Sequence, residues 1–487
     1  MKDFNYYLNK IGEIGFVEQI LHSLVYVSGL PSVHPNEVVI FESGDIGLVI
    51  SMGGQNAEIL ILSEAKIRAG SQLVRTGELL KISVGEGILG RVLDPLGRPL
   101  GKPIHMKNIE LRSIDKDPEA IIAREEVKES LETGVALVDL VVPIAKGQRE
   151  LVIGDRKTGK TQFLLQTVIS QAKKGVTCIY AVIGQRHFDF KKLEEFFGEK
   201  EVMKNIIIVA SSSSDPAGLV YLTPYTAMTV AEYFRDQGKD VLVILDDMTT
   251  HATYYREISL LARRFPGRSS YPGDIFYVHA KIMERAGKFK KGSITCLPVA
   301  GTVLGDLSGY IQTNLMSMTD GHIFFDIDLY NQGRRPAVNP FLSVTRVGHR
   351  AQTPLQRDIS HEVSSFLVVH ERMRQYMHFG AEVSENVQKI LALGEKLIAF
   401  FNQPADTIMS ANLNTLLLAG LWVGVWKEVG IDVMKREMEQ ITLSYGIDDA
   451  FRKKVDELAI SFSKFGDLVN SLRQNDEIIL EKINRKK

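Results

Sequence analysis

Three stretches of the chain differ in how their hydrophobic and polar positions alternate. From about residue 16 to residue 83, short β-rich runs alternate with turn residues. Residues 38–41, 47–51 and 57–62 are predicted as strands, and a tight turn at 53–56 joins the last two. Strands this short and this closely spaced are typical of a small barrel or sandwich, and we expect a β-barrel.

The second stretch, from about residue 84 to residue 352, alternates β-rich runs with helical patterns. This alternation is typical of a mostly parallel sheet covered by helices. Continuous apolar runs suited to buried central strands lie at 150–153, 178–183, 206–210 and 241–245. The pattern therefore predicts an α/β core.

From residue 354 onward we find no convincing strand in the sequence pattern. The apolar spacing of helices is present at 362–377, 382–401 and 448–471. A chain of 487 residues is also too long for a single hydrophobic core. We expect three domains, namely an N-terminal β-barrel domain at 1–83, an α/β domain at 84–353 and a C-terminal helical bundle at 354–487.

Composition and charge exclude several classes of protein. Hydrophobic residues make up 45% and charged residues 24%, which is ordinary for globular proteins. The formal net charge of -1 provides no overall positive field, so we expect no nucleic-acid partner. The longest apolar stretch, 416–426, is shorter than the roughly 18 residues that a membrane span needs. With no secretory signal pattern at the N-terminus, we expect any contact with a membrane to come through partners.

The strongest local motif is a G-x-x-x-x-G-K-T sequence between a strand pattern and a helical pattern. It comprises Gly154, Asp155, Arg156, Lys157, Thr158, Gly159, Lys160 and Thr161. The glycines let backbone N–H groups surround phosphates, and the N-terminus of the following helix adds partial positive charge. We expect Lys160 to contact the β- and γ-phosphates and the Thr161 hydroxyl to hold Mg²⁺. The alternative, a glycine-rich turn with a surface lysine, does not account for the order of strand, loop and helix.

An acidic residue that can complete a nucleotide site follows the apolar run at 241–245. Asp246 directly ends this run, at the carboxyl end of a predicted buried strand. A carboxylate there lies beside the phosphate loop and can orient Mg²⁺ through water. The next residue, Asp247, is a candidate N-cap of the following helix, and both roles can hold at once. The two motifs together predict a P-loop NTPase and nothing more specific.

Longer segments around these motifs indicate which family of P-loop proteins the chain resembles. Four of them are GVALVDLVVPIAKGQRELVIGDRKTGKT at 134–161, RRFPGRSSYPGDIFYVHAKIMERA at 263–286, LPVAGTVLGDLSGYIQTNLMSMTDGHIFF at 297–325 and RPAVNPFLSVTRVGHRAQ at 335–352. Together they closely resemble the alpha subunits of F-type ATP synthases. The resemblance is dense from residue 85 to about residue 356 and weaker on both sides. It implies a RecA-like P-loop core between a β-barrel and a helical bundle.

One position separates the alpha type from the catalytic beta type within this resemblance. Beta-type chains carry a glutamate at the end of the strand after the P-loop helix, and this chain has Gln185 there. An amide cannot accept the proton of an attacking water at neutral pH. The resemblance therefore implies a regulatory, non-catalytic site for ATP or ADP with Mg²⁺, with Gln185 beside the nucleotide.

The resemblance also implies roles for residues outside the P-loop. Arg346 matches the arginine finger of the family, which crosses the subunit boundary and stabilises charge in the neighbouring beta site. The alternative is a structural arginine paired with a carboxylate. Arg335 and Pro336 match positions that line the adenine pocket, and Gln403 is expected to make a similar contact from the helical domain.

This chain departs from the pattern of the family at several positions. Lys157 stands where alpha chains usually have glutamine, which adds a cation near the phosphates. Gln312 stands in place of a usual proline, and Thr345 replaces a usual serine but keeps the hydroxyl. Ala405 takes the place of a second glutamine on the adenine side.

The resemblance implies a set of partners. Three copies of the chain are expected to alternate with three beta-type chains in a ring around a central-stalk gamma subunit. A delta subunit of the stator is a further candidate partner, although the segment before the first strands is short. Through this assembly the chain is expected to lie peripherally on the cytoplasmic face of a bacterial-type cell membrane. There it would couple ATP synthesis or hydrolysis to proton or sodium transport in a membrane sector.

Two alternatives place the same P-loop core in a homohexamer. A Rho-type translocase predicts basic and aromatic stripes for RNA, which the nearly neutral charge disfavours. A secretion-type export ATPase requires a carboxylate where Gln185 stands. We therefore favour the interpretation that the chain is an alpha-type subunit.

Overall fold

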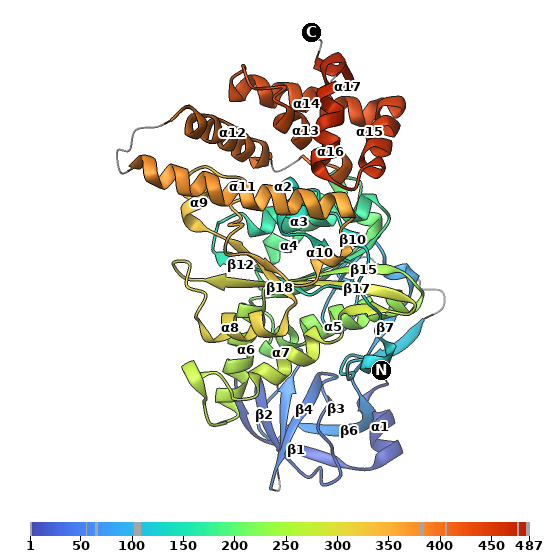
Figure 1. The fold of residues 1–487 in the computed structure, drawn as a ribbon. Coiled ribbons are helices and arrows are strands. Elements are labelled where there is room, and N and C mark those ends of the chain that lie inside the picture. Colours follow the sequence, from blue (N-terminus) through green and yellow to red (C-terminus); the bar gives the residue numbers. More distant parts are fainter. Residues whose placement is uncertain are drawn as a thin grey trace.

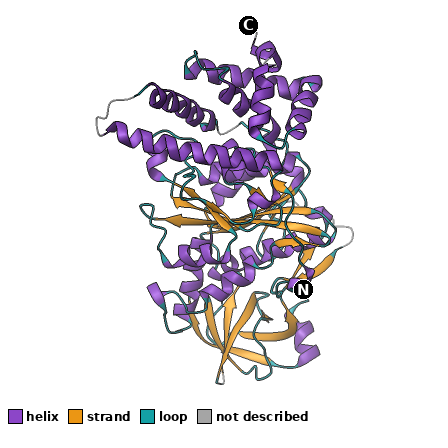
Figure 2. Ribbon diagram, in the orientation of Figure 1, coloured by secondary structure: helices purple, strands orange, loops and turns teal. Residues whose placement is uncertain are grey.

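The computed structural model describes residues 2–54, 56–63, 67–101, 109–378, 384–404, 407–474 and 477–483. Figures 1 and 2 show three layers stacked along the long axis, with a β-barrel at the bottom, a sheet flanked by helices in the middle and helices at the top. The expected combination of β-barrel, P-loop α/β core and helical C-terminal part is therefore confirmed.

The barrel follows a short helix, α1 (Phe4–Ile11), and closes in the strand order β1-β2-β5-β4-β3-β6. Its strands are β1 (Ile14–Leu21), β2 (Leu24–Ser28), β3 (Glu37–Phe41), β4 (Ile46–Gly53), β5 (Asn56–Ile61) and β6 (Gln72–Leu79). All five residues of β3 are buried because the strand has neighbours on both faces. Val39 and Phe41 point into the barrel core, whereas Val38 packs toward the central domain and Ile40 toward α1.

The central domain contains a nine-stranded sheet with the order β19-β18-β12-β17-β15-β13-β14-β8, and β16 pairs with β17 beside this path. The strands are β8 (Val92–Leu93), β12 (Glu150–Asp155), β13 (Thr177–Gln185), β14 (Ile206–Ser212), β15 (Asp240–Asp246), β16 (Gly287–Phe289), β17 (Gly292–Thr302), β18 (Gly321–Phe325) and β19 (Val344–Thr345). The pairs among β12, β13, β14, β15 and β17 are parallel, so their carboxyl ends lie at one edge of the sheet.

Helices cover both faces of this sheet. They are α2 (Ala136–Val141), α3 (Lys160–Lys173), α4 (His187–Glu199), α5 (Ala217–Asp236), α6 (Met248–Leu261), α7 (Ile275–Met283), α8 (Tyr310–Met318), α9 (Ile327–Asn331) and α10 (Gly348–Ala351). Alternate residues of β12 show why its apolar run is continuous. Val152 joins the core that contains α3, whereas Leu151 and Ile153 join the core that contains α5.

Two small sheets connect the parts of the chain. Strand β7 (Lys81–Val84) pairs with β9 (Glu110–Ser113), and β10 (Ser130–Leu131) pairs with β11 (Ile144–Ala145). The expected domain boundary between residues 83 and 84 lies inside β7, just before its last residue, Val84.

In the C-terminal layer the described residues form helices joined by short loops, and none of these residues belongs to a strand. Its helices are α11 (Pro354–His378), α12 (Glu385–Phe401), α13 (Ala411–Val423), α14 (Ile431–Ile447), α15 (Asp449–Ser461), α16 (Phe465–Gln474) and α17 (Glu477–Leu480). The expected single helical segment at 448–471 is wrong in one respect, because α15 and α16 are separate. Phe462 has extended backbone angles, and the Phe465 N–H donates to the Asp358 carboxylate at 2.6 Å, which starts a new helix against α11. The expected helix at 382–401 begins at Glu385, and its first two residues lie outside the described ranges.

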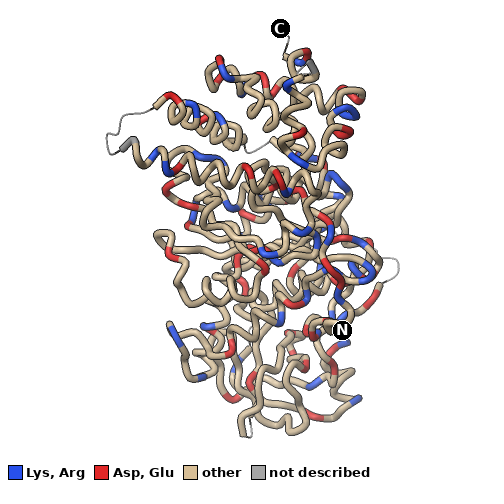
Figure 3. Tube along the Cα trace, viewed as in Figure 1, with Lys and Arg blue, Asp and Glu red and all other residues tan. Residues whose placement is uncertain are grey.

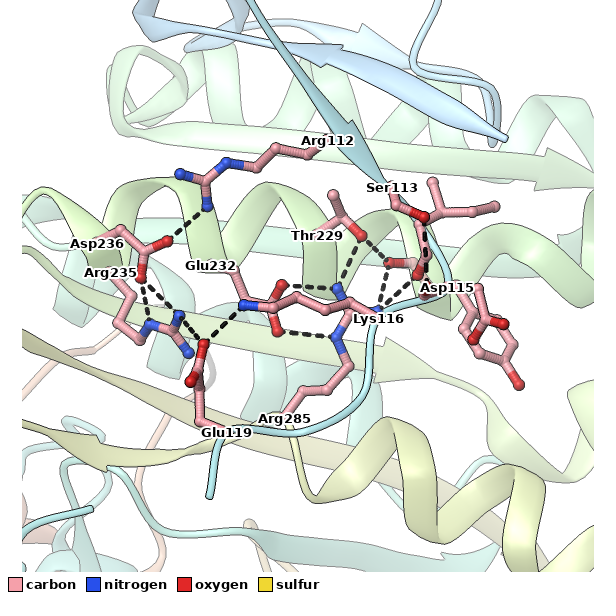
Figure 4. A network of polar contacts seen from close by, with 12 residues as sticks. Arg112, Ser113, Asp115, Lys116, Glu119, Thr229, Glu232, Arg235, Asp236 and Arg285 are labelled. Carbon is pink, nitrogen blue, oxygen red and sulfur yellow. Dashed lines mark hydrogen bonds and ion pairs between the residues drawn. The ribbon is translucent and has the colours of Figure 1, made fainter. Parts of the chain in front are cut away.

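A fully buried ion pair holds the connecting segment against the central domain. The guanidinium of Arg285 uses all five of its N–H donors, of which two bond the Glu232 carboxylate and one bonds the Thr229 hydroxyl. The other two bond the carbonyls of Ile114 and Tyr225. Figure 4 shows this group, which we call the Arg285 network, beside α5, where the segment that follows Ser113 runs past Arg285.

Charged side chains are spread over all three layers. In Figure 3, Lys and Arg are interspersed with Asp and Glu along the whole trace, and no large region of one sign is visible in this view. This distribution agrees with the net charge of -1.

Candidate functional site

The P-loop connects the end of β12 to the start of α3. Gly154 has φ 156°, and a Cβ at this position would lie 2.3 Å from the carbonyl oxygen of Phe325, so only glycine fits here. Gly159 has φ 98° and directly precedes the first helical residue, Lys160. Lys157 also has a positive φ, 64°, which is strained for a residue with a side chain. The sequence therefore folds into a loop whose backbone N–H groups precede a helix N-terminus.

The polar side chains of the loop divide into bonded and free groups. The ammonium of Lys160 donates to the carbonyls of Gly154 and Asp155 at 2.6 Å each, and the Thr158 hydroxyl donates to the carbonyl of Asp155 at 2.8 Å. Burial lowers the pKa of Lys160, and the carboxylates of the site partly offset this effect. Arg156 and Lys157 are exposed and make no side-chain hydrogen bond or ion pair within the described residues. Three cations thus lie on one short loop, and two of them have no partner within the described chain.

The predicted acidic residue lies at the end of the neighbouring strand. Asp246 is the last residue of β15, and its carboxylate accepts a hydrogen bond from the Tyr180 hydroxyl at 2.8 Å. Burial, with a smaller contribution from the adjacent Asp247 charge, raises the pKa of Asp246 to about 6. Asp247 caps α6 by accepting from the Thr250 N–H. The capping role and the expected role of Asp246 are therefore compatible in this structure.

Gln185 is the last residue of β13, next to the Asp246 backbone. Its side-chain amide donates to the carbonyl oxygen of Asp246 at 3.3 Å. The Gln185 side chain is partly buried and does not line the cleft beside the P-loop. No carboxylate therefore stands at this strand end to accept a proton from water.

These elements surround one cleft of about 700 Å³, which we call the P-loop cleft. Its lining side chains come from the P-loop, from the start of α6, from the end of β17 and from the segment that follows it. They are Asp155, Arg156, Lys157, Lys160, Thr161, Asp246, Asp247, Thr249, Thr250, Thr253, Val299, Gly301, Thr302, Val303, Leu304, Gln312 and Ile327. The structure thus brings Lys160, Thr161 and Asp246 together as expected.

The chemistry of this cleft fits a magnesium nucleotide. Free cations and a helix N-terminus attract phosphates, and a hydroxyl with a nearby buried carboxylate suits a hydrated divalent cation. Among the described residues, no group of three or more His, Cys, Asp or Glu side chains is arranged to hold a metal. Mg²⁺ commonly takes one or two protein ligands and completes its coordination with phosphates and water.

The other residues expected at the nucleotide lie outside this cleft. Arg335 and Pro336 line a separate cavity of about 180 Å³, beside α9, α11 and α12. The guanidinium of Arg335 lies 3.6 Å from the centre of the Tyr330 ring and donates to the Tyr330 carbonyl at 2.9 Å. The side chain of Arg335 is therefore bonded within its own segment, whereas its backbone N–H donates to Asn402 Oδ1 at 3.0 Å and its carbonyl accepts from the Gln403 N–H at 2.7 Å.

The side-chain amide of Gln403 bonds backbone groups of two other segments. Its amide accepts from the Ala136 N–H at 3.0 Å and donates to the carbonyls of Gly134 at 2.8 Å and Thr407 at 2.5 Å. Only 5% of its surface is exposed. In this structure Gln403 links the segment before α2 to the C-terminal layer and does not line the P-loop cleft.

Arg346 lies at the opposite edge of the sheet from the P-loop. It directly follows β19, which pairs with the start of β18, and the start of β18 pairs with the start of β12. The side chain of Arg346 is exposed and makes no hydrogen bond or ion pair within the described residues. A structural pairing with a carboxylate, the alternative considered for this arginine, is absent from the described part of the chain.

Two polar contacts of the site's acidic residues were not expected from the sequence. Tyr180 bonds Asp246, and the only signal for it is a tyrosine within the otherwise aliphatic run of β13. Thr302 ends β17 and donates to the carboxylate of Asp155, which also accepts from the Gly305 N–H at 3.0 Å. Because Asp155 and Thr302 are paired residues of neighbouring parallel strands, correct strand pairing would have revealed this contact.

The departures from the family pattern fall in different places. Lys157 and Gln312 both line the P-loop cleft, and Gln312 donates to the carbonyl of Gly301 at 2.6 Å. Thr345 is half-buried next to Arg346. Ala405 lies outside the described residues.

Comparisons with known proteins identify the family. Residues 134–345 match the model of the ATP synthase alpha/beta family, nucleotide-binding domain. The chain is 37% identical over 470 residues to ATP synthase subunit alpha of Mycoplasmoides gallisepticum, which covers 92% of this chain and 91% of that relative. None of the helices in the described residues is both long enough and apolar enough to cross a membrane. The chain therefore belongs to the alpha-subunit family of F-type ATP synthases, the non-catalytic nucleotide-binding subunits of that enzyme.

Proposed function

We propose that the P-loop cleft of this chain binds ATP or ADP with Mg²⁺ as a regulatory ligand. Lys160 and the N-terminus of α3 would hold the phosphates, while Thr161 and Asp246 would hold Mg²⁺, the latter through water. The bound ion would supply positive charge to the phosphate oxygens. The observation that carries the proposal is the P-loop cleft itself, where loop cations face a buried carboxyl group while the adjacent strand ends in the amide of Gln185.

The remaining P-loop residues have supporting roles in this proposal. Gly154, Thr158 and Gly159 shape the loop, and Asp155 fixes it against the segment after β17. Arg156 and Lys157 would add positive charge near the outer phosphates. Arg335, Pro336 and Gln403 remain candidates for the adenine side, and the contacts of Gln403 favour an indirect role there.

We further propose that Arg346 acts outside its own chain. A guanidinium that is exposed and unpaired within the described chain is available to a neighbouring subunit. In the adjacent beta-type site its permanent charge would stabilise the phosphoryl group in the transition state. Its location at the sheet edge opposite the P-loop supports a role at the other subunit boundary.

The proposed assembly follows from the family. Three copies of this chain would alternate with three beta-type chains around a gamma subunit, with a possible delta contact through the N-terminal part. The complex would lie on the cytoplasmic face of the cell membrane and couple ATP synthesis or hydrolysis to proton or sodium transport. Within the chain, we propose domain boundaries at 83/84 and 353/354; the second is supported by the start of α11 at Pro354.

Co-purification with a tagged chain tests the assembly. We expect equimolar recovery of a beta-type chain and little ATPase activity from the tagged chain alone. A homohexamer with strong ATPase activity of its own would contradict the proposal and favour an export-type or translocase function.

The finger is tested in the assembled complex. Arg346→Ala is expected to lower turnover by about 10³- to 10⁵-fold, while the variant chain still binds nucleotide. Arg350→Ala provides a matched control, because this exposed arginine lies four residues further along, on α10, and its side chain makes no hydrogen bond within the described residues. Normal turnover with Arg346→Ala would remove the finger assignment.

A further inference from the structure

The position of Arg346 is determined by the backbone on both sides of it. Its side chain makes no hydrogen bond or ion pair in the described chain, so neither kind of bond fixes the guanidinium, although its charge acts on the nearby Glu150 carboxyl. A misplacement of about 1 Å in a group that acts on a reacting centre can cost on the order of 100-fold in rate. The groups that hold residues 343–348, which we call the finger loop, therefore matter for its action.

The first support of the finger loop is the hydroxyl of Thr345. It donates to the carbonyl of Pro143 at 3.0 Å and accepts from the amide of Gln148 and from the Gly348 N–H, both at 3.1 Å. These three bonds use the single O–H and both lone pairs of the hydroxyl. Gly348 lies so close to Pro143 that an added Cβ would be 1.8 Å from its carbonyl oxygen. Thr345 thus fixes the backbone immediately before and after Arg346.

Gln148 holds Thr345 from a fully buried position. Its side chain has 0% exposure, and its oxygen accepts from the Ala145 N–H at 2.9 Å. Its two amide hydrogens bond the Glu150 carboxyl at 2.5 Å and the Thr345 hydroxyl at 3.1 Å. Because every N–H of this amide is used and no water reaches it, the amide has a single favourable orientation.

The second support acts on the backbone N–H of Arg346. This N–H donates to the carbonyl of Asp320 at 3.0 Å. The Asp320 carboxylate in turn accepts from the backbone N–H of Arg149 at 2.9 Å and from its guanidinium at 2.8 and 3.1 Å. The Asp320 N–H completes the exchange by donating to the Arg149 carbonyl at 2.7 Å.

Three consecutive residues therefore support both flanks of Arg346. Gln148 acts through Thr345, Arg149 acts through Asp320, and Glu150 pairs with Gly321 at the start of β18. The Glu150 carboxyl is fully buried, and one of its oxygens has no hydrogen-bond partner in the described residues. Burial raises its pKa, which favours a neutral carboxyl beside the loop.

We propose that Gln148 and Thr345 are positioning residues for Arg346, so that the hydrogen bond between them sets the rate of the neighbouring catalytic site. This inference rests on the proposed finger role of Arg346. Neither side chain contacts the P-loop cleft, and both act through the backbone of the finger loop.

The test uses the complex assembled with its beta-type partner chains. Gln148→Leu keeps much of the side-chain volume but removes both donated bonds. We expect kcat to fall by about 10- to 100-fold, while KM for ATP and the affinity of this chain for nucleotide stay within about twofold of wild type. Gln171→Leu is the control, because Gln171 is also a buried glutamine with a bond to a backbone carbonyl, and it lies on α3 away from the finger loop.

Thr345 provides a second pair of variants in case Gln148→Leu does not fold. Thr345→Val keeps the shape of the side chain and loses the hydroxyl, so kcat should fall as with Gln148→Leu. Thr345→Ser keeps the hydroxyl and should retain at least half of the wild-type kcat. Equal activity of the valine and serine variants would overturn the inference.

A double-mutant cycle separates this inference from the finger assignment itself. Combined with Arg346→Ala, Gln148→Leu should lower kcat by less than about twofold more, because the group that it positions is already gone. Full additivity would show a general structural effect and overturn the inference. If Arg346→Ala alone leaves turnover normal, the proposed function fails instead, and any loss in Gln148→Leu has another cause.

Discussion

The Arg285 network and the P-loop cleft both gather charged groups inside the central domain, but they differ in how many of those groups are satisfied. Arg285 uses every N–H donor, and its carboxylate partner Glu232 is 2% exposed. In the P-loop cleft, Lys160 bonds only carbonyls of its own loop, and Arg156 and Lys157 have no partner within the described residues. A cluster in which every polar group is bonded is costly to break and leaves no group for a ligand, whereas a cluster with unbonded cations is available to a ligand.

The largest effect is expected from breaking the saturated cluster. Arg285→Ala leaves the Glu232 carboxylate buried without a partner and should lower the free energy of unfolding by about 3–5 kcal/mol. Denaturant unfolding of the isolated chain measures this loss. Replacing Arg285 and Glu232 together by methionine should recover most of it, because no unpaired charge then remains. Wild-type stability in Arg285→Ala would show that the two clusters do not differ in this way.

The next largest effect is expected at Asp246, whose contribution to stability depends on pH. Its pKa is raised from 3.8 to about 6, so the folded nucleotide-free chain binds this proton more tightly than the unfolded chain. The stabilisation from the bound proton is complete below pH 3.8 and is lost as the pH rises through about 6. Asp246→Asn should therefore be more stable than wild type by about 3 kcal/mol at pH 7.5, and the difference should vanish near pH 4. Unfolding curves across this range measure the difference, and a gap that is independent of pH would argue against the raised pKa.

Replacing Lys160 should weaken nucleotide binding much more than it changes the stability of the fold. Lys160→Met should weaken ATP binding by about 10- to 100-fold, because a charge-assisted bond to phosphate is lost. The stability of the empty chain should change little, since the ammonium bonds only carbonyls of its own loop. Equilibrium binding of a fluorescent ATP analogue measures the affinity. Lys173→Met, at the exposed other end of α3, should leave affinity unchanged, and an equal loss there would point to a general charge effect.

The smallest effect is expected at Asp247, which lines the cleft but also caps α6. Asp247→Ala removes the acceptor for the Thr250 N–H and should cost about 1 kcal/mol of unfolding free energy. Asp247→Asn keeps a capping oxygen and should cost a few tenths of that. Thermal unfolding of both variants distinguishes them, and equal stabilities would mean that the cap contributes nothing.

Much of the fold could be predicted because its signals are local. The continuous apolar runs of β12, β13, β14 and β15 follow from burial on both faces of the sheet, and the P-loop carries its own order of strand, glycines and helix. The break between α15 and α16 was missed, because it depends on a contact between Phe465 and Asp358, 107 residues apart.

For the candidate site, local motifs predict which residues lie close together but not the long-range contacts around them. Lys160, Thr161 and Asp246 each belong to a motif, and the structure places them around one cleft. The bond from Tyr180 to Asp246 joins positions 66 residues apart, and the contacts of Gln403 with Gly134 and Ala136 span more than 260. Such contacts require the strand order and the packing of the C-terminal layer, which no local pattern contains.

Strand β12 has a mechanical consequence. At about 3.3 Å per residue, its six residues form a stiff rod roughly 20 Å long, with the P-loop at one end and the support of Arg346 at the other. Because β12 is paired with β17 on one side and β18 on the other, its two ends are held in a fixed register, and the P-loop and the residues that support Arg346 keep a fixed separation. The P-loop and the finger loop, which lie toward opposite ends of β12, are therefore connected by one strand.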